Sequence, residues 1–352
     1  MPSVAPSSPE PRVSVVVPCY NVAPWLPRCL DTVLAALPQD GELIAVDDES
    51  GDGTLAILQA RARLDGRLRV IPARHGGVSA ARNRGMDAAR GTYLFFVDPD
   101  DAVEADFFSA LTDALERDAA DCCICAYCDV DDATGERRDV PLNGDYRYSS
   151  NAAIVDEFLP LFFGYSFADV RAWYGGRPLF AGRREMGSVC RLVLRRAIVE
   201  ARHMRFDPDV VWGEDALFIS EYLLAAESMT CVNRPLYRTT LRDTGALRSV
   251  PKDGLRYCRN KLAMLRKREA LDRLSGGRLA EHYAASCVFS LAEILSYVFR
   301  RRVPLGEGLR IFREYLRAEP VRPALRGFPL SVRRPLLALT VLFLRLYARS
   351  FG

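Results

Sequence analysis

Three carboxylates in one short segment carry the most chemical information in this sequence. They form the box Asp98-Pro99-Asp100-Asp101, which directly follows the apolar run Tyr93–Val97. Carboxylates crowded at the end of a buried strand repel one another, and a hard divalent cation, Mg²⁺ or Mn²⁺, relieves that repulsion and leaves room for substrate phosphates. Such a cation can neutralise a departing diphosphate. Taken alone, a box of this kind is more often an ordinary strand-to-helix turn.

A second acidic turn favours the chemical interpretation of the box. Asp47 and Asp48 open the segment DDESGDGT after the apolar run Leu43–Val46. An aspartate at a strand end can accept a hydrogen bond from the imide N–H of uracil or thymine, and Tyr20 offers a flat face for stacking. The alternative is a plain turn that leads to a helix capped by Thr54.

A third acidic pair precedes a predicted helix. In Gly213-Glu214-Asp215, Asp215 can serve as the general base that takes the proton from an attacking hydroxyl. The alternative is that both acids only stabilise the first helical turn. The three histidines match no metal or triad spacing, and HExxH, GxSxG, GxGxxG and P-loop motifs are absent. This argues against metalloproteases, serine hydrolases, dehydrogenases and P-loop nucleotidases.

Alternating strand and helix patterns would bring these polar segments together. Short β-branched runs predict strands at Val13–Val17, Leu43–Val46, Leu68–Ile71 and Tyr93–Val97. Apolar spacing predicts helices after Pro24, over Leu55–Leu64 with Thr54 as cap, over Ala80–Ala89 with Ser79 as cap, over Ala216–Ala226, and from Leu255 onward. Strands separated by helices imply an α/β fold with a mostly parallel sheet, whose ligands bind at the carboxyl ends of the strands.

The composition is that of a foldable protein with an uneven charge. Of the 352 residues, 49% are hydrophobic and 26% are charged, which excludes an intrinsically disordered chain. The net charge of +3 combines 27 basic and 37 acidic residues in 1–250 with 21 basic and 8 acidic residues in 251–352. We expect a metal or cationic group to bind the acidic part and phosphate or anionic lipid to bind the basic tail. Nucleic acid is not an expected partner, because no nucleic-acid-binding motif accompanies the tail.

The ten cysteines do not indicate a secreted disulfide protein. Met1–Arg12 lacks the apolar core of a signal peptide, so a reducing cytoplasm is expected. The run DCCICAY, residues 121–127, predicts a buried strand rather than a zinc site, because no second ligand pair follows. The apolar run Leu336–Leu344 is too short to span a bilayer. With its flanking arginines it suits peripheral attachment to the inner face of the membrane, or else a helix that closes the core or a dimer interface.

Four segments, taken together, closely resemble one known family. VSVVVPCYN, LIAVDDESGDGT, HGGVSAARNRGMDAARGTYLFFVDPDD and VVWGEDALF occur in this order within residues 12–250. They are similar to bacterial family 2 glycosyltransferases with the GT-A fold, particularly those that build capsule, exopolysaccharide and cell-wall polymers. The resemblance implies a GT-A sheet flanked by helices, followed here by a helical, basic C-terminal region.

The resemblance also implies site residues. The donor-binding residues would be Pro18, Tyr20, Asn21, Asp48, Arg82, Asn83, Asp98 and Asp100. Asp100 and Asp101 would hold Mg²⁺ or Mn²⁺, and Asp215, with Glu214 beside it, would be the catalytic base. Arg191 stands where the family often has a lysine, which keeps the charge and changes the geometry.

Two smaller features extend the comparison with the family. Pro99 occupies a position of the box where a small polar residue is common in the family. In the later stretch Tyr237–Arg242, the arginine would reach the donor phosphates.

The implied reaction is a single displacement that inverts the anomeric configuration. A hydroxyl of a saccharide or lipid-linked acceptor, deprotonated by Asp215, attacks the donor sugar opposite its nucleoside diphosphate, which is expected to be UDP. Residues 1–11 would be disordered, 12–125 would bind the nucleotide sugar, 126–250 would bind the acceptor, and 251–352 would contact membrane or a second copy of the chain.

Two other classes of protein remain as alternatives. A sugar-nucleotide pyrophosphorylase or nucleotidyltransferase would have a Gly-rich loop with Arg and Lys after its first strand, where this chain has PCYNVAPW. A non-catalytic sugar-nucleotide-binding protein would not need carboxylates at all three places.

Overall fold

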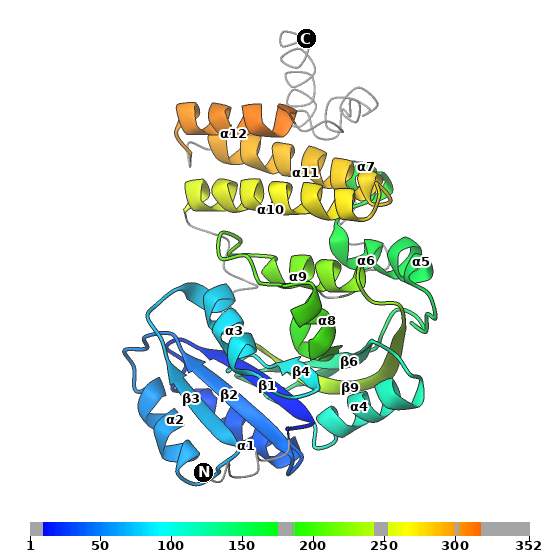
Figure 1. Ribbon diagram of the computed structural model, residues 1–352. Coiled ribbons are helices and arrows are strands. Elements are labelled where there is room, and N and C mark those ends of the chain that lie inside the picture. The colour runs from blue at the N-terminus through cyan, green and yellow to red at the C-terminus, as the bar shows by residue number, and fades with distance from the viewer. Residues whose placement is uncertain (1–9, 175–184, 186, 243–252, 300–302, 318–352) are drawn as a thin grey trace, which may run out of the picture. The chain divides into compact units, whose positions relative to one another are not determined.

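The computed structural model describes residues 10–174, 185, 187–242, 253–299 and 303–317 of the chain (Figure 1). They fall into two compact units that interleave along the sequence. The sheet unit draws on Met1–Asn151, Ser188–Phe218 and Ala225–Gly245, and the helical unit on Ala152–Gly187, Ile219–Leu224 and Ala246–Gly352. The predicted division at residues 125 and 250 concerns function, so it stays a prediction.

Nine strands form one mixed sheet in the described part of the sheet unit. The order is β3-β2-β1-β4-β8-β6-β9-β5, with β7 paired to β6. The bounds are β1 Val13–Cys19, β2 Gly41–Asp47, β3 Leu68–Pro72, β4 Tyr93–Phe96, β5 Ala102–Val103, β6 Cys122–Asp131, β7 Arg137–Val140, β8 Leu192–Arg195 and β9 Met229–Leu241. Strands β3, β2, β1 and β4 are parallel neighbours, and β6 is parallel to β9. The four predicted strands and their parallel arrangement are therefore confirmed.

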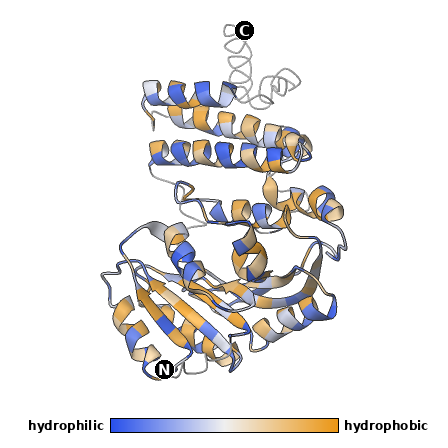
Figure 2. Ribbon diagram, in the orientation of Figure 1, coloured by the Kyte–Doolittle hydropathy of each residue, from blue (hydrophilic) through white to orange (hydrophobic). Residues whose placement is uncertain are grey.

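Helices alternate with the parallel strands, as the sequence predicts. They are α1 Leu26–Ala36, α2 Thr54–Ala62, α3 Gly77–Ala88 and α4 Phe107–Arg117, followed later by α8 Arg196–Ala201 and α9 Glu214–Leu223. All residues of β1 and β2 are buried, which is typical of strands covered on both faces. Hydrophobic residues predominate in these strands (Figure 2).

The two predicted helix caps are wrong. Thr54 is the first residue of α2, and the cap position before it is Gly53 in a left-handed conformation. Asp52 takes over the expected role, since its Oδ1 accepts hydrogen bonds from the N–H and O–H of Thr54 at 3.1 and 2.6 Å. Ser79 lies inside α3, whose cap position is Gly76. Loop contacts accompany both starts: the hydroxyl of Thr54 accepts the N–H of Val22 at 2.9 Å, and Asp48 accepts the N–H of Gly77 at 2.8 Å.

The cysteine-rich run forms the buried strand β6, as predicted. All ten cysteines of the chain are buried and free of disulfides. Burial raises the pKa of the Cys122 thiol well above its usual value, so this thiol stays protonated and behaves as a small apolar group.

The helical unit contains α5 Asn151–Ala153, a π-helical turn Ile154–Phe158, α6 Pro160–Phe163, α7 Phe167–Tyr174, α10 Gly254–Leu274, α11 Ala280–Phe299 and α12 Leu305–Arg317. Polar contacts join its three long helices: Lys261 of α10 pairs with Glu293 of α11 at 2.8 Å, and the hydroxyl of Tyr315 of α12 donates to the Lys261 carbonyl at 2.7 Å. The prediction of helices from Leu255 onward is confirmed for the described residues.

Two predictions about the ends of the chain fall on residues that the structure does not describe. These are the apolar run Leu336–Leu344 and residues 1–9 of the predicted disordered N-terminus. Among the helices that it does describe, none is long and apolar enough to cross a membrane.

Close packing of α3 on β1 depends on one glycine. A Cβ at Gly85 would lie 2.2 Å from Cγ1 of Val16, whereas a Cβ at Gly66 would meet no atom within 4 Å. We expect Gly85→Ala to lower the free energy of unfolding by about 1–3 kcal/mol through overpacking, and Gly66→Ala to leave it nearly unchanged. Chemical denaturation of both variants measures the difference, and equal stability of the two would contradict this packing.

Candidate functional site

Polar residues follow all four parallel strands at the same edge of the sheet. In the strand register, Cys19 lies opposite Asp47, which in turn lies opposite Pro72. The loops that begin there carry the polar residues of the predicted donor site. The sheet thus brings these residues to one edge, where open α/β sheets bind ligands.

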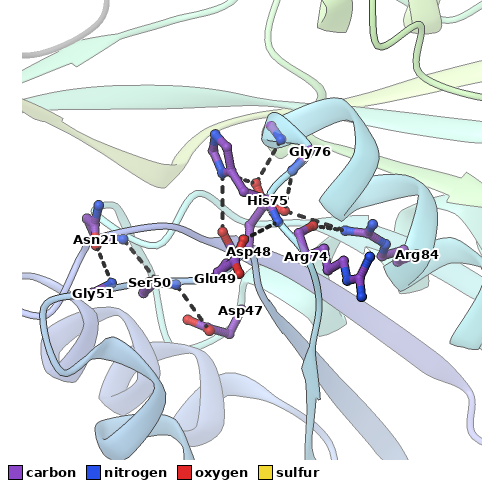
Figure 3. Close-up of polar contacts among 11 residues, drawn as sticks. Asn21, Asp47, Asp48, Glu49, Ser50, Gly51, Arg74, His75, Gly76 and Arg84 are labelled. Atoms are coloured by element: carbon purple, nitrogen blue, oxygen red, sulfur yellow. Dashed lines mark hydrogen bonds and ion pairs between the residues drawn. The ribbon is translucent and has the colours of Figure 1, made fainter.

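Asp48 anchors the start of α3 (Figure 3). Its Oδ1 accepts the N–H of Gly76 at 2.9 Å and its Oδ2 accepts the N–H of Gly77 at 2.8 Å. The Nδ1 of His75 lies 3.0 Å from the same Oδ2, and Arg84 lies 3.4 Å from Oδ1. The carboxylate is buried. Negative charge at the N-terminus of a helix is stabilised by the unpaired amides there.

His75 is a site residue that the sequence analysis missed. Its ring lies against Tyr20, with ring centroids 4.3 Å apart and planes 31° apart. Tyr20 is 48% exposed and the His75 side chain is 50% exposed, so the two rings form an accessible aromatic face beside Asp48. The only available clue was the position of His75, directly before Gly76-Gly77 at the end of a predicted strand.

Asn21 joins the loops after β1 and β2. Its Oδ1 accepts the N–H of Gly51 at 2.8 Å, and its own N–H donates to Oγ of Ser50 at 3.0 Å (Figure 3). It has a positive φ of 52°, a conformation that asparagine tolerates better than most residues. Pro18, also predicted in the donor site, is buried within β1. Asn21 thus holds the loops after β1 and β2 together.

Arg82 connects two of the three acidic segments. Its Nη2 lies 3.0 Å from Oδ1 of Asp98, and its Nη1 lies 3.1 Å from Oε1 of Glu214 and 2.5 Å from Oδ1 of Asp215. The residue is only 2% exposed. Burial would lower its pKa, but Asp215 and Asp98 outweigh burial and raise that pKa well above its usual value. The guanidinium is therefore a permanent cation among these carboxylates.

Asp215 is partly buried, with 14% of its side chain exposed, and has a perturbed pKa. Its second oxygen, Oδ2, accepts the N–H of Val189 at 3.1 Å, from the 3₁₀ turn Val189–Arg191. Burial raises the pKa of Asp215 to about 7, and Arg82 partly opposes that shift. A carboxylate that titrates near neutral pH can take a proton from an attacking hydroxyl.

The three carboxylates of the acidic box have different surroundings. Asp101 is 6% exposed, and its oxygens accept the O–H of Tyr237 at 2.7 Å and the N–H of Thr240 at 2.8 Å. Burial, followed by the charge of Asp98, raises the pKa of Asp101 to about 7. The side chains of Asp98 and Asp100 are 35% and 25% exposed. These two are the partly exposed carboxylates of the box, and each pairs with an arginine, Asp98 with Arg82 and Asp100 with Arg242.

Three other predicted residues make mainly structural contacts. The Asn83 amide accepts the N–H of Phe206 at 2.9 Å and donates to its carbonyl at 2.8 Å. Arg191 is fully buried and donates to the Cys125 carbonyl at 3.3 Å. Arg242 pairs with Asp100, and its guanidinium lies 4.0 Å from the ring centroid of Trp25.

The residues of this edge can accept a divalent cation only in part. Across the described residues, no group of three or more His, Cys, Asp or Glu side chains could hold a metal ion. Mg²⁺ commonly binds through one or two protein carboxylates and takes its remaining ligands from substrate phosphates and water. The accessible carboxylates of Asp98 and Asp100 fit that manner of binding, whereas Asp101 already has two protein donors.

A protein-family model matches the part of the chain that carries the acidic box. Residues 14–173 match the family model of glycosyl transferase family 2. This segment is a family 2 glycosyltransferase domain. It includes β1 to β4 and the loops after them, with the acidic box.

Relatives of this family 2 domain carry glycosyltransferase names. The uncharacterised glycosyltransferase EpsJ of Bacillus subtilis (strain 168) is 31% identical over 227 residues, which are 64% of this chain and 60% of EpsJ. Chondroitin synthase of Escherichia coli is 32% identical over 114 residues, 32% of this chain and 17% of the synthase. The match thus spans about 60% of the length of EpsJ and less of the synthase.

A solved structure confirms the predicted GT-A fold. Residues 1–349 of TarS from S. aureus, in complex with UDP-GlcNAc, superpose with a TM-score of 0.63 at 18% identity, covering 97% of this chain and 91% of that TarS fragment. At this identity the likeness concerns the fold, an α/β sheet flanked by helices.

The hydrogen bond from Tyr237 to Asp101 should stabilise the protein chiefly when Asp101 is ionised. We expect Tyr237→Phe to cost about 1.5–3 kcal/mol of unfolding free energy at pH 8, because an ionised buried carboxylate loses a donor. The loss should shrink at pH 5, below the pKa of about 7, where Asp101 is protonated.

Tyr93→Phe is the matched control for this prediction. Its hydroxyl donates at 2.9 Å to Glu116, whose side chain is 47% exposed, so water can replace the lost donor. Denaturant unfolding at both pH values makes the comparison. An equal loss at pH 5 and pH 8 would contradict the role given to Tyr237.

Proposed function

We propose that this protein is an inverting glycosyltransferase, which moves a sugar from a nucleotide-sugar donor to a hydroxyl of a saccharide or lipid-linked acceptor in cell-surface polysaccharide synthesis. The observation that carries the proposal is the position of Asp215. It is a carboxylate only 14% exposed, with its pKa raised to about 7, and it is tied through Arg82 to the acidic box at the ligand-binding edge of a family 2 domain.

The donor nucleobase would bind against the aromatic face of Tyr20 and His75. The face lies beside Asp48, whose carboxylate orients the His75 ring through Nδ1 and leaves Nε2 to meet the base. UDP is the expected donor nucleotide. Structures of the same fold support a nucleotide-sugar donor: TarS was solved with UDP and with UDP-GlcNAc, and a mannosyltransferase of Pyrobaculum calidifontis, with a TM-score of 0.50, with GDP-Man and Mn²⁺.

Mg²⁺ or Mn²⁺ is the proposed cofactor, and it would stabilise the charge of the departing diphosphate when bound. The structure leads us to narrow its protein ligands. Asp98 and Asp100 are both partly exposed, and Asp98 is already shared with the buried Arg82, whereas both oxygens of Asp101 accept hydrogen bonds from Tyr237 and Thr240. We therefore propose Asp100 as the metal ligand and Asp101 as the residue that holds the box in position.

The acceptor hydroxyl would lose its proton to Asp215 as it attacks the anomeric carbon. Val189 and Arg82 keep one carboxylate oxygen each in place, so the side chain is oriented before the acceptor arrives. Glu214 shares Nη1 of Arg82 with Asp215, which makes it a neighbour that adjusts the charge of the site. Peripheral membrane contact and self-association stay predictions about the C-terminal region.

Replacing the proposed base should stop turnover and leave the donor bound. We expect Asp215→Asn to lower the turnover number by about 10²–10⁴-fold with UDP affinity nearly unchanged, because the amide cannot accept the proton. Turnover of the unaltered protein should rise as pH passes through about 7, since the base must be ionised. Steady-state kinetics and calorimetry with UDP measure the two quantities.

Glu214→Gln is the matched control for the base assignment. It is an adjacent acid on the same arginine, and we expect a clearly smaller loss of turnover. Full activity of Asp215→Asn, or a larger loss from Glu214→Gln, would remove Asp215 from the proposed mechanism.

The two neighbouring aspartates of the box should respond differently to Mn²⁺. We expect Asp100→Asn to abolish the gain in UDP affinity that Mn²⁺ produces, because that carboxylate would hold the cation. Asp101→Asn should keep a gain within about threefold of the unaltered protein, because asparagine can still accept one hydrogen bond at the buried position. Titration calorimetry with UDP, with and without Mn²⁺, compares them. Loss of the Mn²⁺ effect in Asp101→Asn alone would reverse the two assignments.

A further inference from the structure

The position of Arg82 does not suit a ligand of the donor. The resemblance to the family implies donor binding for this residue, yet it is 2% exposed and both of its Nη atoms already contact carboxylates. Those carboxylates come from two places: the box after β4 and the first turn of α9. The guanidinium is thus enclosed by carboxylates of the proposed donor site, Asp98, and of the proposed base, Asp215 with Glu214.

We propose that Arg82 is a positioning residue that acts through Asp215, setting the orientation and the charge of the base. This inference rests on the proposed function. It assigns to Arg82 a part in the chemical step and none in donor affinity.

Besides the ion pairs of its two Nη atoms, Arg82 has an aromatic contact with the face of its guanidinium group. The guanidinium carbon lies 5.2 Å from the ring centroid of Phe206, and Phe206 stacks on Phe218 of α9 with centroids 4.0 Å apart and planes 7° apart. Asn83, the next residue of α3, holds the main chain of Phe206 on both sides. This stack connects α3 to α9, so the arginine and the base have a defined relative position.

A lysine cannot reproduce this arrangement. Arg82 uses Nη1 for the two acids of α9 and Nη2 for Asp98, which requires the planar fork of a guanidinium. An ammonium group supplies the same charge from a single nitrogen. Charge and geometry at Arg82 can therefore be separated by substitution.

The groups around Asp215 determine how its proton affinity depends on Arg82. Burial raises the pKa of Asp215, and the charges of Glu214 and Asp98 raise it further. Arg82 and the N–H of Val189 lower it, and the neighbouring Cys190 has its own pKa raised by burial, so it stays neutral. Since Arg82 is the cation in this set, its removal moves the pKa of Asp215 upward, away from the ionised form that a base requires.

The test compares Arg82→Met, Arg82→Lys and a control, Arg90→Met. Arg90 also pairs with a buried carboxylate of the sheet unit, Glu42 at 3.1 Å, but Glu42 is not one of the proposed site residues. Three quantities are measured on the full chain. They are UDP affinity with Mn²⁺, the pH profile of turnover with the UDP-sugar that the unaltered protein hydrolyses fastest, and the ¹³C carboxyl titration of Asp215, identified by its absence in Asp215→Asn.

We expect Arg82→Met to keep UDP affinity within about threefold, to lower turnover by about 10²-fold or more, and to shift the Asp215 titration and the turnover profile upward by about one pH unit or more. Arg82→Lys should return the midpoints of the Asp215 titration and of the turnover profile toward those of the unaltered protein, without restoring full turnover. Arg90→Met should leave both pH values unchanged. When Asp215→Asn is already present, adding Arg82→Met should lower turnover by less than about threefold more, because the effect of Arg82 on turnover passes through Asp215.

Two results would overturn the inference. One is a loss of UDP affinity of about tenfold or more in Arg82→Met with an unshifted Asp215 titration, which would make the arginine a donor ligand. The other is a loss of turnover in the double variant equal to the product of the single losses. If Arg82→Met does not fold, Arg82→Gln replaces it with the same criteria. If the unaltered protein shows no activity but Arg82→Met still shifts the Asp215 titration, the proposed function is disproved. The effect of Arg82 on the Asp215 carboxylate then still holds.

Discussion

Buried carboxylates need partners, and this requirement organises the ligand-binding edge of the sheet. An ionised carboxylate without a donor is very costly away from water, so each acid brought to the edge must be met by a donor from elsewhere. The donors are the N–H groups of Gly76 and Gly77 for Asp48, Tyr237 and Thr240 for Asp101, and Arg82 and Val189 for Asp215. Through these pairs, the acids join segments that are far apart in the sequence.

Neighbouring residues of the same type acquire opposite properties in this arrangement. Asp100 and Asp101 are adjacent in the sequence, but the turn after β4 leaves the first partly exposed and directs the second toward β9. The first carboxylate stays partly exposed and pairs with Arg242, while the second accepts hydrogen bonds inside the protein and has its pKa raised to about 7 by burial. A motif written as identical letters therefore contains one open and one closed position.

Sequence patterns predicted the frame of the site better than its contacts. The β-branched runs predicted β1 to β4, and the polar residues after them lie at one edge as parallel strands require. The partners of those residues were not predictable. The resemblance singled out Tyr237–Arg242 for the donor phosphates and not as a donor to Asp101, and no pattern marked Val189 as a partner of Asp215. Helix starts failed for a different reason, since Asp52, only two residues before Thr54, accepts the hydrogen bonds at the start of α2. His75 was passed over because its spacing to other histidines carries no information about a neighbouring tyrosine ring.

The pairing of β6 with β9 has a consequence for how the chain folds during synthesis. Residue 122 pairs with residue 229, and part of the helical unit lies between them in the sequence. The parallel strands β1 to β4 are complete by residue 96, so they can assemble on the ribosome long before β9 exists. Until β9 arrives, Asp101 lacks both of its donors. The acidic box must therefore reach its final shape late, after the sheet that carries it, and a nascent chain paused between the two events has the frame of the site without its charge arrangement.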